Sequence, residues 1–186
     1  MPPTRDIAAY PDRDALEAVR EDLAIIIGAT VAAGFKVKRG SVCGEIAASG
    51  KLRRRSRTTA AGTGFAVDSN VGEVTDASVF VAGDVLKNAA GSVIGTIAAG
   101  GVDPVANTVT LTGNAAVAVA AGAAVLGSDG SQTAKAIAGD ESDGVGDNGI
   151  GIYIGGPLKE AKLLDLDATA KAELGGVSTV GGIFKF

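Results

Sequence analysis

The sequence predicts a mainly β protein: a small β-barrel or β-sandwich with one or two short helices and an inserted second small β-module. Short apolar runs alternate with polar residues at a period of two, which is typical of half-buried strands. Glycine, which makes up 28 of the 186 residues, interrupts these runs where a backbone bends or bulges. Strands of about five residues recur every 8–12 residues or so, as in antiparallel barrels and sandwiches.

Residues 35–51 show the strand–glycine–strand pattern most clearly. The apolar residues there are Phe35, Val37, Val42 and Ile46, and they alternate with the charged residues Lys36, Lys38 and Glu45. Gly40 and Gly44 interrupt the run. Ser49-Gly50 is a turn signal that ends the run. A looser version recurs at 81–86 and at 119–127. This recurrence predicts an architecture but no chemistry.

Residues 1–22 are expected to form an N-terminal arm and a short helix. Residues 1–11 hold three of the five prolines, which favours an extended arm without its own core. Residues 12–23 have the apolar spacing of a short helix, and the isoleucines of 24–27 predict a buried strand that ends at Gly28. We expect the arm to dock on a partner protein, with these contact residues: Pro2, Pro3, Arg5 and Tyr10.

Residues 51–57 form the densest run of charge in the chain. One interpretation is a contact with phosphate or with an acidic protein surface, and the other is a solvated loop. The run has no aromatic residue and the chain has a net charge of −4, so nucleic acid is the weaker version of the first interpretation. The candidate contact residues in this run are Arg53, Arg54, Arg55 and Arg57.

Residues 74–127 are predicted to be a self-contained series of short strands joined by turns. The domain organisation expected is therefore an arm over 1–22, a core domain made of 23–73 with 128–186, and an inserted β-module over 74–127. Within the C-terminal part of the core domain, 128–186, residues 149–154 alternate as a strand, and residues 163–174 have the spacing of a helix. Asp165 or Asp167 is expected to cap that helix, and Gly175-Gly176 to end it.

The residue types argue against an enzyme and against a metal or cofactor site. Histidine is absent, which removes the commonest general base and metal ligand. Cys43 is alone, so we expect it to be buried rather than bonded to a second cysteine or to a metal. There is no Gly-x-Ser-x-Gly motif, and the acidic residues at 140–143 lie in a turn that lacks the glutamate of a calcium loop.

No membrane partner is expected either. The first residues lack the apolar region of a signal peptide, and the apolar stretch at 23–27 is far too short to span a bilayer. We expect a soluble chain that is made in the cytoplasm.

Three groups of residues resemble one family in the same order along the chain. They are Val37-Lys38-Arg39-Gly40-Ser41-Val42-Cys43-Gly44-Glu45-Ile46 with 48–51, Asp129-Gly130-Ser131 with 134–137, and Tyr153-Ile154-Gly155-Gly156 with the segment to Ile183. This order is similar to that of the lambda-type head decoration (capsid cement) proteins of tailed bacteriophages. The resemblance covers about 23–55 and 128–186, and the chain departs from it at 74–127 and at the arginines of 53–55.

The resemblance implies a virion protein on the outer surface of an icosahedral head, assembled in the host cytoplasm. Such a protein locks subunits of the major capsid protein together, often as a trimer of neighbouring copies, and needs no active site. The alternative is a β-rich virion fibre or adhesion module that binds a host surface or glycan. The position of the protein on the particle distinguishes the two.

Overall fold

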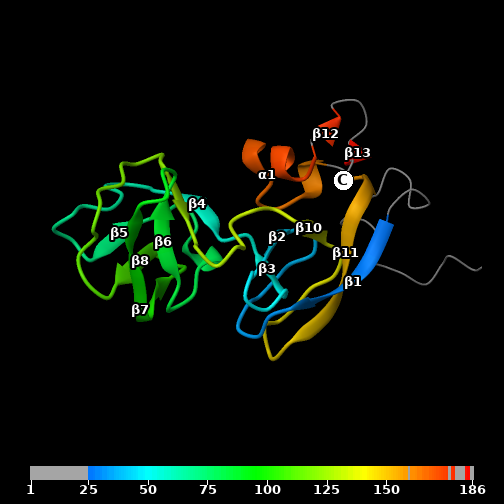
Figure 1. Cartoon of the computed structure of the whole chain (residues 1–186), viewed down its shortest axis with the longest axis horizontal. Helices are drawn as coiled ribbons and strands as arrows, with labels where there is room; N and C mark the ends of the chain where they lie inside the picture. The colour runs from blue at the N-terminus through cyan, green and yellow to red at the C-terminus, as the bar shows by residue number, and fades with distance from the viewer. Residues whose placement is uncertain (1–24, 159, 176, 179–182, 185–186) are drawn as a thin grey trace, which may run out of the picture. The chain divides into compact units, whose positions relative to one another are not determined.

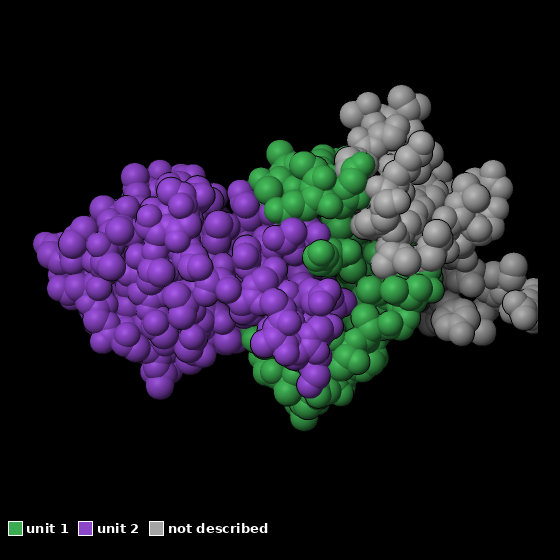
Figure 2. Space-filling view, viewed as in Figure 1, with its two compact units in different colours: residues 1–42, 135–186 green, residues 43–134 purple. Residues whose placement is uncertain are grey.

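The structure is a computed structural model that describes residues 25–158, 160–175, 177–178 and 183–184 (Figure 1). It confirms the predicted fold class, because the chain is mainly β, with a closed five-strand barrel, a curled half-barrel sheet and one α-helix. Figure 2 colours two compact units, residues 1–42 with 135–186, and residues 43–134.

The barrel belongs to a sheet with the strand order β1-β3-β2-β10-β11-β13-β12, in which an additional β1–β11 pairing closes the first five strands. The strands are β1 (Ile25–Val31), β2 (Val42–Glu45), β3 (Leu52–Arg54), β10 (Ala136–Ala138), β11 (Asn148–Pro157), β12 (Val177–Ser178) and β13 (Ile183–Phe184). β1 runs antiparallel to β11 along its length, with Val31 opposite Asn148. The alternating run that the sequence predicts at 149–154 is therefore part of the longest strand of the barrel.

The curled sheet has the strand order β4-β9-β6-β7-β8-β5. Its strands are β4 (Arg57–Thr59), β5 (Val71–Glu73), β6 (Val85–Asn88), β7 (Val93–Asp103), β8 (Thr108–Leu111) and β9 (Ala124–Leu126). An isolated bridge pairs Ala60 with Val74, the residues that directly follow its two outer strands, β4 and β5. A buried apolar cluster that includes Phe65, Leu86 and Ile97 fills the inside of the curl.

The curled sheet begins before the boundary expected at Val74. Arg57 of β4 lies opposite Leu126 of β9, and β5 pairs with β8. Both β4 and β5 therefore belong to the same sheet as the strands of 74–127, although the sequence assigns them to the core domain. Each has only three residues and lacks a clear apolar alternation, so the sequence gives no sign of them.

The chain enters and leaves the curled sheet through two segments that are bonded to each other. The Gly127 N–H donates to the Ser56 carbonyl at 2.7 Å, and the Ser56 N–H donates to the Ser131 carbonyl at 3.2 Å. The Ser131 and Ser56 hydroxyls are hydrogen-bonded to each other at 2.7 Å. A Cβ atom at Gly127 would lie 2.5 Å from the Ser56 Oγ, so glycine is what permits this approach.

Helical structure is shorter than the sequence predicts for 163–174. The α-helix α1 covers Ala168–Glu173, and the 3-10 helices η2 and η3 cover Ala77–Val79 and Glu160–Lys162. Asp165 has a positive φ of 65°, which a helix cannot contain, so the helix begins only after it. Asp167 is the N-cap, and its carboxylate accepts from the Ala170 N–H. The sequence predicts either Asp165 or Asp167 as this cap.

Candidate functional site

The predicted contact residues fall into two groups in the structure. Pro2, Pro3, Arg5 and Tyr10 of the arm lie outside the described residues. Arg53 and Arg54 lie on β3, Arg55 follows it, and Arg57 begins β4. These four arginines lie within five residues of the sequence but have quite different surroundings.

Arg53 is buried, with only 1% of its side chain exposed. Its Nη1 donates to Asp84 Oδ1 and to Asp129 Oδ2, both at 2.9 Å. Its Nη2 donates to Asp84 Oδ2 at 2.8 Å and to the Val79 carbonyl at 2.7 Å. Neither interpretation of the charged run describes Arg53, because the residue is an internal cross-link and not a surface group.

The two carboxylates that hold Arg53 are themselves fixed by neighbouring turns. Asp84 Oδ2 also accepts from the Val81 N–H at 3.0 Å. Asp129 Oδ1 accepts from the backbone N–H and from the hydroxyl of Ser131. Burial is the strongest single influence and raises the pKa of Asp129, but the Ser131 hydrogen bonds and the Arg53 charge together hold that pKa below its ordinary value.

Arg55 is also internal, with a relative exposure of 2%. Its Nε donates to the Gln132 carbonyl at 3.1 Å, and the Gln132 side chain accepts from the Gly130 N–H at 3.0 Å. Arg55 therefore fastens the segment that leaves the curled sheet. The expectation that Arg53 and Arg55 reach a partner surface is corrected for this reason: both side chains are enclosed by their own chain.

Arg54 and Arg57 are the two arginines of the run that reach the surface. Arg54, with 20% of its side chain exposed, pairs with Asp76 at 2.5 Å and donates to the Ser78 hydroxyl at 2.6 Å. Burial acts most strongly on the pKa of Asp76 and raises it, but the Ser78 hydrogen bonds and Arg54 outweigh burial and leave that pKa lowered. Arg57 is partly exposed on β4.

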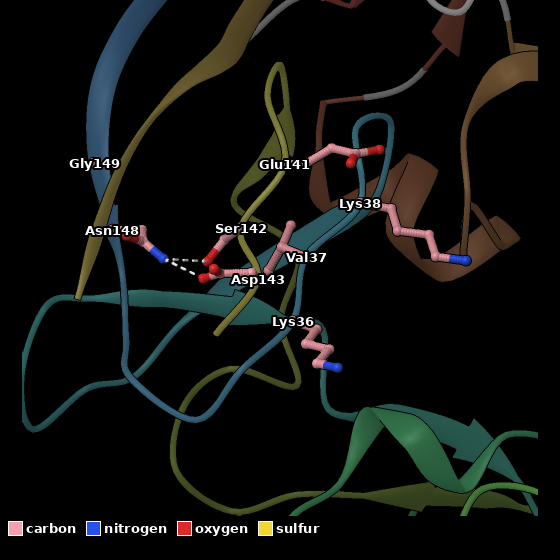
Figure 3. Close-up of a pocket in the computed structure, with 8 residues that line it drawn as sticks. All are labelled: Lys36, Val37, Lys38, Glu141, Ser142, Asp143, Asn148 and Gly149. Atoms are coloured by element: carbon pink, nitrogen blue, oxygen red, sulfur yellow. Dashed lines mark hydrogen bonds between the residues drawn. The ribbon is translucent and has the colours of Figure 1, made fainter. Parts of the chain in front are cut away.

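A shallow groove of about 600 Å³ lies in the unit formed by 1–42 and 135–186 (Figure 3). It is lined by these residues: Lys36, Val37, Lys38, Glu141, Ser142, Asp143, Asn148 and Gly149. Val37 forms an antiparallel bridge with Ser142, through an N–H to carbonyl bond in each direction, at 3.0 and 2.8 Å. This register sets Lys36 across from Asp143 and Lys38 across from Glu141, as cross-strand neighbours of opposite charge.

The Asp143 carboxylate is hydrogen-bonded within the turn that follows it, and not to the lysines. Its Oδ1 accepts from the Val145 N–H at 2.9 Å and from the Asn148 side-chain amide at 3.0 Å. The pKa of Asp143 is lowered chiefly by the Val145 hydrogen bond, with smaller contributions from Asn148 and from the charge of Lys36. In Figure 3 the amino groups of Lys36 and Lys38 extend away from Asp143 and Asn148.

The other polar groups picked out in the sequence are structural where the structure describes them. Asp140 Oδ2 accepts from the Gly151 N–H at 2.8 Å and so fixes β11. Cys43 is fully buried on β2, as expected for its residue type. Among the described residues, no three His, Cys, Asp or Glu side chains are grouped to hold a metal ion. No described helix is long and apolar enough to cross a membrane.

No protein-family model, no curated protein and no solved structure matches the chain. We therefore argue its function from its own residues and geometry.

Proposed function

We propose that this protein is a bacteriophage head decoration (cement) protein. In this role it binds the outer surface of the head, stabilises contacts between subunits of the major capsid protein, and works beside neighbouring copies of itself, as a trimer. The supporting observation is the composition of the barrel. The segments that resemble decoration proteins, 23–55 and 128–186, are far apart in sequence, yet they supply all five barrel strands, β1, β2, β3, β10 and β11.

The use that the chain makes of its charged groups supports a binding role over a catalytic one. Arg53, Asp84 and Asp129 hold the fold together, and Asp140 and Asp143 fix turns. These groups bond to their own chain, whereas the members of an acid–base pair face a bound substrate. A protein of this kind acts by presenting a shaped surface.

The contact residues that we propose are a revised set. Arg54 and Arg57 stay in it because they reach the surface, while Arg53 and Arg55 leave it because they are buried. The arm residues Pro2, Pro3, Arg5 and Tyr10 stay in it as the sequence predicts.

The test is to add the purified protein to expanded heads that lack it. We expect saturable, stoichiometric binding by sedimentation, added density on the outer surface by cryo-electron microscopy, and a higher melting temperature of the heads. Deleting Pro2–Tyr10 should weaken binding while far-UV circular dichroism stays unchanged. Heads that bind none of the protein would refute the proposal, and binding to host cells or glycans instead would favour the fibre or adhesion module.

A salt series tests the arginines. Replacing both Arg54 and Arg57 with serine should weaken binding and flatten its salt dependence, because exposed charges are screened beyond about 8–10 Å at physiological ionic strength. Replacing Lys135 and Lys162, which are exposed lysines in the other unit, gives a matched loss of two charges. Equal salt slopes for the two double variants would remove Arg54 and Arg57 from the contact set.

A further inference from the structure

The segment 36–38 is paired along one side only. Val37 directs its N–H and its carbonyl to Ser142, and its side chain is buried, with a relative exposure of 1%. In an antiparallel pair, the backbone groups of the two flanking residues point to the opposite side. The N–H and carbonyl groups of Lys36 and Lys38 therefore face away from Ser142.

Three of these four groups have no partner in the part of the chain that the structure describes. The Lys38 carbonyl accepts from the Ser41 N–H at 3.0 Å. The Lys36 N–H, the Lys36 carbonyl and the Lys38 N–H form no hydrogen bond there. Both residues are exposed to solvent. The result is a short open backbone edge beside the isolated Val37–Ser142 bridge, and an open edge is the feature that strand addition requires.

The side chains at this edge determine what can pair with it. Lys36 and Lys38 lie on the same face, opposite to Val37, and neither forms an ion pair with any described residue. Figure 3 shows their amino groups extending away from Asp143. Lysines at a strand edge normally repel an unwanted strand. A strand with carboxylates at the facing positions, with Cβ atoms about 4.5–5.5 Å away, would convert that repulsion into attraction.

We propose that the edge 36–38 binds an extended segment of a partner protein by strand addition, and that this segment carries acidic residues at alternate positions. The partner backbone pairs with the free groups of Lys36 and Lys38, and its carboxylates face the two ammonium groups. This inference goes beyond the capsid role and does not depend on it, since it rests on the segment 36–38 alone, which lies between β1 and β2.

The experiment is NMR titration of the full chain with a capped peptide of sequence Val-Glu-Val-Glu-Val, and with Val-Lys-Val-Lys-Val as its matched control. The acidic peptide should shift the amide signals of Lys36 and Lys38 and slow their hydrogen exchange, because binding gives each N–H an acceptor. The basic peptide should do neither. Failure of the acidic peptide to protect these two amides would overturn the proposal, even if it binds elsewhere.

Two variant pairs separate the charge from the backbone pairing. Changing Lys36 and Lys38 to Glu should weaken binding about tenfold or more, since two attractive pairs become repulsive. The same change at Lys135 and Lys162 should alter affinity less than about twofold. Lys36→Pro removes the open N–H and should bind more weakly than Lys36→Ala, which has the same charge.

The Lys36 N–H forms no hydrogen bond with the residues that the structure describes, so proline at this edge is expected to leave the barrel folded. If Lys36→Pro does unfold, the exchange rates of the unaltered chain still decide the matter. Equal affinity of the Pro and Ala variants, or of the two glutamate variants, would refute strand addition at this edge. Head binding is measured separately, so its failure would leave this result unaffected.

Discussion

Replacing Arg53 with methionine tests whether one buried guanidinium holds the β2–β3 hairpin to the curled sheet. The side chain is 1% exposed and donates hydrogen bonds to both carboxylate oxygens of Asp84, to Asp129 and to the Val79 carbonyl. Methionine is long and apolar, so it fills much of the same space. The lost stability then comes mainly from the groups that Arg53 leaves behind.

The magnitude follows from how well each of those groups is solvated. Asp84 has 11% of its side chain exposed, so little water can replace the cation, and among the described residues the Val81 N–H is the hydrogen-bond donor that its carboxylate keeps. Asp129 is 27% exposed and keeps both Ser131 bonds, so its loss is smaller. Removing one partner of a buried ion pair costs about 3–5 kcal/mol, and we expect that loss for Arg53→Met. Arg54→Met, on the same strand, should cost no more than about 1 kcal/mol.

A second substitution identifies the cause of the loss. Adding Asp84→Asn to Arg53→Met should restore about 1–2 kcal/mol, because the uncompensated buried charge is then gone. The measurement is native-state hydrogen exchange of the Ile97 and Leu111 amides, which are bonded inside the curled sheet, in increasing urea. A loss below about 1 kcal/mol for Arg53→Met, or a further loss on adding Asp84→Asn, would refute this reasoning.

Three further outcomes are expected. Gly44→Ala places a Cβ atom 2.0 Å from the Ser131 carbonyl oxygen and should destabilise the fold by about 2–4 kcal/mol in urea unfolding, whereas Gly28→Ala, with nothing within 4 Å, should change it by less than about 0.5 kcal/mol. Because the pKa of Asp129 is lowered on folding, this carboxylate stabilises the fold at pH values above its ordinary pKa of 3.8. That stabilisation is lost as the pH falls through the folded-state pKa. Asp129→Asn should therefore be less stable at neutral pH and should show a weaker fall in stability below about pH 4 by circular dichroism. Replacing 57–126 with a short Gly/Ser linker, together with Arg53→Met, should leave a barrel that unfolds cooperatively. Replacing only 74–127 leaves β4 and β5 without the strands they pair with, so this variant should aggregate in light scattering. The opposite ranking of the two variants would contradict the boundary at Arg57.

The features that the sequence could predict depend on neighbours along the chain. The alternation at 149–154 marks β11 because each residue type reports directly on the face it occupies. Asp167 could be predicted as a cap because its partner, the Ala170 N–H, is three residues away. The alternation of Lys36, Val37 and Lys38 likewise predicts their exposure and burial, which the structure confirms.

The features that the sequence could not predict depend on partners far along the chain. Arg53 is bonded to carboxylates 31 and 76 residues away, and each of these lies in a segment that reads as an ordinary turn. Arg53 and Arg55 are alternate residues, as inward-facing strand residues are, but a run of arginines masks that signal. The open edge at Lys36 could not be predicted either, because it follows from which side of Val37 pairs with Ser142.

The paired segments at Ser56 and Ser131 also affect the order in which the chain folds. About 80 residues separate β3 from β10, and closing a loop of that length before the barrel can form is slow. Once the curled sheet has folded, the bonds among Ser56, Gly127 and Ser131 hold its two ends together, and the loop is shortened to about ten residues. An eightfold shorter loop lowers the entropic cost of closure by about 2 kcal/mol. We therefore expect the curled sheet to fold first, and substitutions in its core to slow the appearance of the barrel as well.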